Sequence, residues 1–79
     1  MPFAKTEEEW AARASAFLKA ELKKAEVTYA ELAKRLKKHG FKETEASITN
    51  KLKRGTFAAS WFLACLAALE RTHIALEDV

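Results

Sequence analysis

Basic side chains are concentrated in the middle of this 79-residue chain, and they are the residues whose types and spacing suggest chemistry. Eight of the fourteen Lys and Arg residues fall between Lys34 and Arg54, where only Glu43 and Glu45 oppose them. This segment therefore carries a net charge of about +6, whereas the rest of the chain, with six basic and nine acidic residues, carries about −3. A net charge of +3 thus conceals one basic pole, which is suited to a polyanion such as DNA.

Two amphipathic helices joined by a turn contain this basic pole. A helix is predicted over about 29–38, because Thr28 with Glu31 forms a capping-box pattern and Gly40 provides a stop. A second helix is predicted over about 45–54. In helix–turn–helix domains the second helix of such a pair enters the major groove.

The second of these helices has one apolar and one polar side. Ile48 and Leu52, four residues apart, form the apolar side, so the polar side is centred on Asn50. Asn can bond adenine, and Lys or Arg can bond guanine. The candidates for contact with bases are Ser47, Thr49, Asn50, Lys53 and Arg54. The candidates for contact with phosphate are Lys34, Lys37, Lys38, Lys42 and Lys51.

Helical patterns also flank the basic pole, which predicts an all-α fold of four helices in a single domain, residues 1–79. A helix over about 7–25 begins with a capping-box pattern, Thr6 with Glu9. A helix over about 58–71 is apolar around most of its circumference, so it must be buried on several sides. The tail HIALEDV alternates weakly, which predicts either a short strand or an extended segment.

The apolar last helix carries more hydrophobic surface than three partner helices are expected to cover. The remainder is predicted to form a homodimer interface through Trp61, Phe62 and Leu66. The alternative function is a protein-interaction module, in which the same helix binds another protein and the basic face only keeps the domain soluble.

The segment TYAELAKRL, a turn, and then ASITNKLKRGTF resemble the Xre/Cro type of helix–turn–helix, the lambda-repressor-like fold. The matching features are Leu32–Ala33, Leu36, Ile48 and the Lys-Arg-Gly ending at Gly55. The resemblance covers roughly residues 17–70, and the chain is also similar to a poorly characterised bacterial family of short domains. The resemblance to the Xre/Cro type implies that the chain is a bacterial transcriptional regulator, which would bind double-stranded DNA as a homodimer.

The sequence departs from this family's pattern in the turn. Family members usually turn directly after the Leu that ends the first helix, whereas residues 37–39 intervene here before Gly40. Glu43 and Glu45 also lie near the start of the second helix, where a carboxylate repels phosphate.

No pattern in the chain predicts an enzyme, a cofactor or a small-molecule substrate. There is no nucleophile–base–acid set, no carboxylate pair and no Gly-rich phosphate loop. Cys65, His39 and His73 lack the spacing of metal ligands. The N-terminus has no apolar signal-peptide region, and the apolar run 57–69 is too short to span a bilayer, so a cytoplasmic location is expected.

Overall fold

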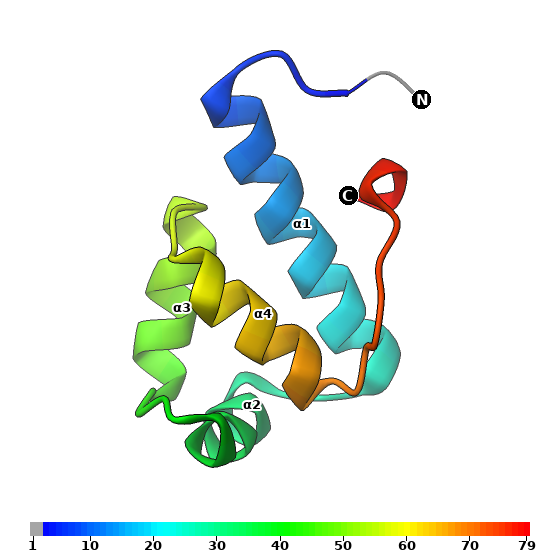
Figure 1. Ribbon diagram of the computed structural model, residues 1–79. Coiled ribbons are helices and arrows are strands. Elements are labelled where there is room, and N and C mark those ends of the chain that lie inside the picture. The colour runs from blue at the N-terminus through cyan, green and yellow to red at the C-terminus, as the bar shows by residue number, and fades with distance from the viewer. Residues whose placement is uncertain (1–2) are drawn as a thin grey trace.

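The computed structural model describes residues 3–79, which form four α-helices (Figure 1). In chain order these are α1 (Glu7–Ala25), α2 (Tyr29–Leu36), α3 (Glu45–Arg54) and α4 (Ala59–Ala68). Two short 3-10 helices, η1 (Lys37–His39) and η2 (Leu76–Asp78), complete the secondary structure of that range. Residues 3–79 contain no strand, so the prediction of an all-α fold with four helices is confirmed.

Two helices end earlier than the sequence pattern indicates. α2 stops at Leu36 instead of residue 38, and η1 carries the chain on in a tighter turn to Gly40. α4 stops at Ala68 instead of residue 71, because Glu70 adopts a left-handed conformation (φ 61°). This conformation turns the chain back onto the last turn of α4, a Schellman ending that normally uses glycine.

Threonine residues cap the first three helices. The side chains of Thr6, Thr28 and Thr44 each accept a hydrogen bond from the N–H group of the third helical residue. The predicted reciprocal bonds at the first two caps are absent, because Glu9 accepts from the Lys5 N–H and Glu31 bonds Arg35. The complete capping box is instead at α3, where Ser47 returns the bond to its cap.

The hydrophobic core lies where all four helices meet. α2 lies across the start of α3 and the end of α4 (Figure 1), and α1 contacts α3. The side chains that are almost fully buried are Leu18, Leu32, Leu36, Ile48, Leu52, Trp61 and Cys65. Every α-helix therefore contributes at least one residue to the core.

Two side chains tie helices together by bonding carbonyl groups at helix C-termini, which lack partners within their own helix. The buried hydroxyl of Ser15 in α1 donates to the Leu52 carbonyl near the end of α3. The guanidinium of Arg35 in α2 donates to the Ala68 carbonyl at the end of α4 (3.1 Å). These bonds fix α3 against α1 and α4 against α2.

The C-terminal tail packs against the core without forming a strand. Arg71 joins it to α1 through an ion pair with the buried carboxylate of Glu21 (2.8 Å). Ile74 and Val79 are half-buried against the core, whereas Leu76 is 58% exposed. Of the two predicted alternatives for the tail, the extended segment is closer to the structure than the strand, but neither included the 3-10 helix η2 in which the tail ends.

Two glycines end helices with positive φ, and only one of them lies against a neighbouring helix. Gly40 has φ 87°, and a Cβ added there would meet no atom within 4 Å. Gly55, which ends α3, has φ 73°, and a Cβ added there would lie 3.2 Å from the carbonyl oxygen of Ala11 in α1. The absence of a side chain at Gly55 therefore permits the close contact between α1 and the end of α3.

We expect Gly55→Ala to destabilise the fold more than Gly40→Ala does. Both substitutions place a side chain in a left-handed conformation, at a cost of about 1–2 kcal/mol. Gly55→Ala also forces α1 and α3 apart, which adds about 1 kcal/mol or more. Urea unfolding of both variants and the parent measures the difference, and equal losses of unfolding free energy would show that the α1 contact is unimportant.

Candidate nucleic-acid interface

Most of the basic side chains between residues 34 and 54 lie at the surface. The exposed ones are Lys34, Lys37, Lys38, Lys42, Lys53 and Arg54. Within residues 3–79 none of these six takes part in an ion pair. Arg35 and Lys51 are different, since both are half-buried and paired with a carboxylate. These six side chains form the basic surface. It keeps an uncompensated positive charge, which is the condition for binding phosphate.

The outward side of α3 is set by the burial of its inward side. Ile48 and Leu52 are 0% and 2% exposed, and Asn50, Lys53 and Arg54 point to solvent. The hydroxyl of Thr49, also exposed, donates to the Glu45 carbonyl of its own helix (2.9 Å). Three of the five base-contact candidates therefore present free polar groups on one side of α3.

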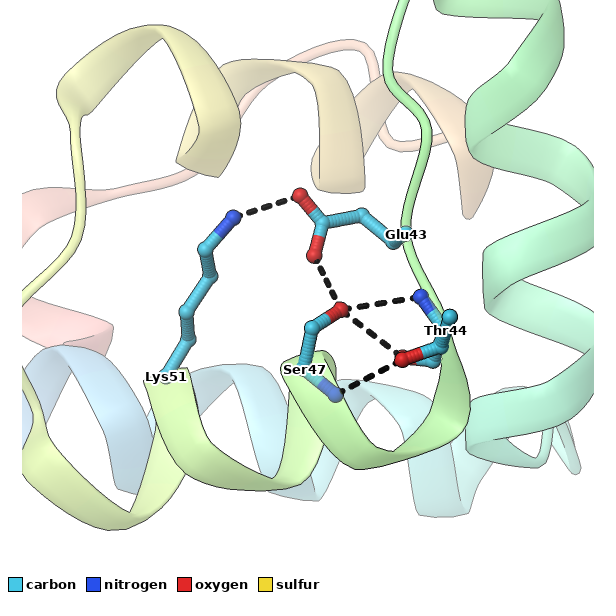
Figure 2. A network of polar contacts seen from close by, with 4 residues as sticks. All are labelled: Glu43, Thr44, Ser47 and Lys51. Carbon is cyan, nitrogen blue, oxygen red and sulfur yellow. Dashed lines mark hydrogen bonds and ion pairs between the residues drawn. The ribbon is translucent and has the colours of Figure 1, made fainter.

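Ser47, another base-contact candidate, is used inside the protein (Figure 2). Its N–H donates to the Thr44 hydroxyl (3.0 Å), and its own hydroxyl accepts from the Thr44 N–H (2.9 Å). The Ser47 hydroxyl also donates to the carboxylate of Glu43 (2.6 Å). Its polar atoms are committed to the start of α3, and little capacity is left for a base.

Lys51, one of the phosphate-contact candidates, is also held internally. Its ammonium group donates to the second carboxylate oxygen of Glu43 (Figure 2) and lies 5.1 Å from the centre of the Trp61 ring. The Lys51 side chain is 28% exposed and that of Glu43 only 6%. This pair joins the turn before α3 to the middle of α3, and the aromatic ring connects both to α4.

The carboxylate of Glu43 is charged although it is buried. Burial alone raises its pKa, but the hydrogen bonds from Lys51 and Ser47 and the positive charge of Lys51 outweigh that effect, so the pKa lies below its usual value of 4.5. The indole N–H of Trp61, which is also buried, lowers the pKa of Glu43 by a smaller amount than Lys51 and Ser47 do. Glu43 therefore does not face phosphate at the start of α3, whereas Glu45 is exposed there.

The network around Glu43 was missed from the sequence. The spacing of Glu43, Ser47 and Lys51, each four residues from the next, could have indicated it, because such residues share one side of a helix. Glu43 itself lies in the turn before α3, so the helical pattern of residues 45–54 does not include it. The hydrogen bond from Arg35 to the Ala68 carbonyl joins residues 33 positions apart in the sequence, so no local pattern could predict it.

The predicted dimer residues lie mostly in the core of the single chain. Trp61 is 1% exposed and Leu66 6%, while Phe62 is half-buried. Both Trp61 and Leu66 belong to the buried core cluster, so they are not available at the surface for a partner. The large apolar side chain that α4 exposes is Leu63, at 65%.

The other groups that could react or bind a metal, the Cys65 thiol among them, do not form a site in residues 3–79. Burial raises the pKa of the Cys65 thiol to about 12, so it stays protonated at neutral pH. Within residues 3–79 no three His, Cys, Asp or Glu side chains gather so that they could hold a metal ion. Over the same range no helix is both long and apolar enough to cross a bilayer.

We expect Glu43→Gln to lower the unfolding free energy by about 1–2 kcal/mol at pH 7, because charge-assisted bonds to Lys51 and Ser47 are lost. A carboxylate with a lowered pKa stabilises the fold above pH 4.5 and loses that effect as the pH falls through its folded-state value. The difference from the parent should therefore narrow below pH 4.5. Urea unfolding at several pH values tests this, with the exposed Glu45→Gln as control. A difference that stays constant with pH would contradict it.

Comparison with known families gives one match over most of the chain. The model of a family described as Domain of unknown function (DUF6471) matches residues 10–74. Comparisons with curated proteins and with solved structures gave no match. The matched range includes α2, α3 and α4, with the whole basic surface and the Glu43 network. This chain is therefore a member of the DUF6471 family.

Proposed function

We propose that this protein binds double-stranded DNA and acts as a bacterial transcriptional regulator, with α3 in the major groove. The observation that carries the proposal is the outward side of α3, where Asn50, Lys53 and Arg54 are exposed together. The carboxylate of Glu43, which would repel phosphate at the start of this helix, is turned inward and neutralised by Lys51. A helix with this side outward matches the requirements for reading base edges.

Phosphate contacts supply most of the affinity in this proposal. Lys34, Lys37, Lys38 and Lys42 are exposed on α2, η1 and the turn that precedes α3. A helix–turn–helix places the first helix across the DNA backbone, so these ammonium groups would bind phosphates beside the groove. Lys51 has no such role here, because its charge is already paired with Glu43.

Base contacts rest on Asn50, Lys53 and Arg54. The hydroxyls of Ser47 and Thr49 already donate to acceptors within the turn and α3, so they can assist only as hydrogen-bond acceptors. A residue such as Asn50 at the centre of the outward side is best placed for a bidentate bond to adenine. The lambda-repressor-like arrangement and the cytoplasmic location belong to the same proposal.

The alternative function, a protein-interaction module built on α4, has less support. It depended on an exposed apolar surface formed by Trp61, Phe62 and Leu66. Two of these side chains fill the core, which leaves Leu63 as the large exposed apolar residue of α4. By contrast, the six exposed cations Lys34, Lys37, Lys38, Lys42, Lys53 and Arg54 have no ion-pair partner within residues 3–79.

We expect Lys37→Ala to weaken binding to all DNA sequences equally. One lost phosphate contact should flatten the plot of log affinity against log salt by about one unit. Fluorescence anisotropy with random duplex DNA between about 50 and 200 mM salt measures both effects. Lys23→Ala, which removes an exposed Lys of α1 outside the basic surface, is the matched control. Absence of binding by the parent at about 50 mM salt would overturn the proposal.

Asn50→Ala should leave the salt dependence unchanged and reduce sequence preference instead. The expected loss is about 1–3 kcal/mol at one base pair of the preferred site, since one bidentate contact disappears. Selection of a site from random duplexes, followed by competition with single-base variants, measures this loss. If the parent and Asn50→Ala select the same site with the same preference at every position, α3 does not read bases through Asn50.

A further inference from the structure

The outward side of α4 is unlike that of the other helices, because it carries no charge. None of the ten residues of α4 is charged, and its exposed positions are Ala59, Ser60, Leu63 and Ala67. Leu63 is 65% exposed, more than Phe3 or Leu76, the other large apolar side chains at the surface. The exposed positions of α1, α2 and α3 all include Lys, Arg or Glu. Solubility alone does not favour an uncharged helix side in a chain that is 32% charged.

The exposed residues of α4 have a shape suited to another helix. Ala59, Leu63 and Ala67 are spaced by four and follow one line along the helix. The central Leu stands between two small residues, and the half-buried ring of Phe62 borders the line. A helix that crosses at Leu63 can therefore approach closely on both sides of the crossing point.

The two ends of α4 indicate that the partner is a second copy of the same helix. At the N-terminus, Ala58 provides no side-chain cap, whereas threonines cap α1, α2 and α3. At the C-terminus, the exposed Glu70 follows the last turn. A helix N-terminus carries partial positive charge and attracts a carboxylate. An antiparallel copy places Glu70 of each chain near the uncapped N-terminus of α4 in the other chain, so the N-termini of both copies gain a carboxylate.

We propose that α4 forms an antiparallel, two-fold contact with α4 of a second copy of this chain, with the axis near Leu63. The contact is isologous, so each chain offers the same surface to the other. It replaces the sequence-based expectation of an interface through Trp61, Phe62 and Leu66. Trp61 and Leu66 hold α4 in its own core, and Leu63 makes the contact between chains.

The size of this surface sets the strength of the dimer. Ten helical residues span about 15 Å, and a contact between two such helices buries less than the roughly 1,200 Å² of a standard stable interface. We therefore expect a dissociation constant on the order of 10–100 µM. The proposal does not rest on DNA binding, because its test uses the protein alone.

Analytical ultracentrifugation of the full chain from about 5 to about 500 µM tests the contact. The parent should pass from monomer to dimer over this range, and Leu63→Glu should remain monomeric throughout. Leu76→Glu is the matched control, since Leu76 is 58% exposed but lies outside α4, and it should dimerise like the parent. A parent that stays monomeric, or a Leu63→Glu variant that dimerises like the parent, would overturn the proposal.

Disulfide cross-linking tests the orientation. Ala59 and Ala67 are eight residues apart, about 12 Å along the helix, so an antiparallel contact brings Ala59 of one chain near Ala67 of the other. A mixture of Ala59→Cys and Ala67→Cys should form a covalent heterodimer, and neither variant should cross-link with itself. The native Cys65 is buried and does not compete. Self-linking of each variant without the mixed product would indicate a parallel contact and overturn this geometry.

Discussion

The burial of Ile48 and Leu52 is the constraint on which the candidate site depends. They are the two buried side chains of α3, at 0% and 2% exposed, and each contributes about 1.5–3 kcal/mol. Because they lie four residues apart, they fix the rotation of α3 about its axis. That rotation decides that Asn50, at the centre of the opposite side, points to solvent. A helix held by two contacts would still slide or tilt, and a second set of interactions prevents this.

The second set is polar and is centred on Glu43. Its carboxylate bonds Ser47 one turn into α3 and Lys51 one turn further, and the Lys51 ammonium rests on the ring of Trp61 in α4. A charge-assisted bond of this kind is stronger in a half-buried setting than at the surface. The network also divides the polar residues of α3 into those that hold the helix in place and those that remain free. Ser47 and Lys51 face inward and hold the helix, which leaves Asn50, Lys53 and Arg54 for a ligand.

Contacts at the ends of helices hold much of the rest of the fold together. α1 and α4 both end with a glutamate in the left-handed conformation, Glu26 at φ 57° and Glu70 at φ 61°. Ser15 and Arg35 bond carbonyl groups at the ends of neighbouring helices, so that the same contacts satisfy helix ends and tie the helices together. The close approach of Ala11 to Gly55 belongs to the same pattern. The start of α4, which has no side-chain cap, is the helix end where the proposed second copy adds a partner.

The sequence by itself determined the features that depend on neighbours along the chain. Threonine caps placed the starts of α1 and α2, and apolar spacing placed the inward positions Ile48 and Leu52. The glycine at residue 55 marked the end of α3. These signals are local, since a cap or an apolar side involves residues three or four apart. Only the tertiary structure decided which polar groups remain free. Whether Lys51 meets Glu43 or solvent, and whether Trp61 or Leu63 lies at the surface, depends on how α4 packs against the other helices. The end of α4 also has a tertiary contact, because the Ala68 carbonyl accepts a bond from Arg35 of α2, which is 33 residues away in the sequence.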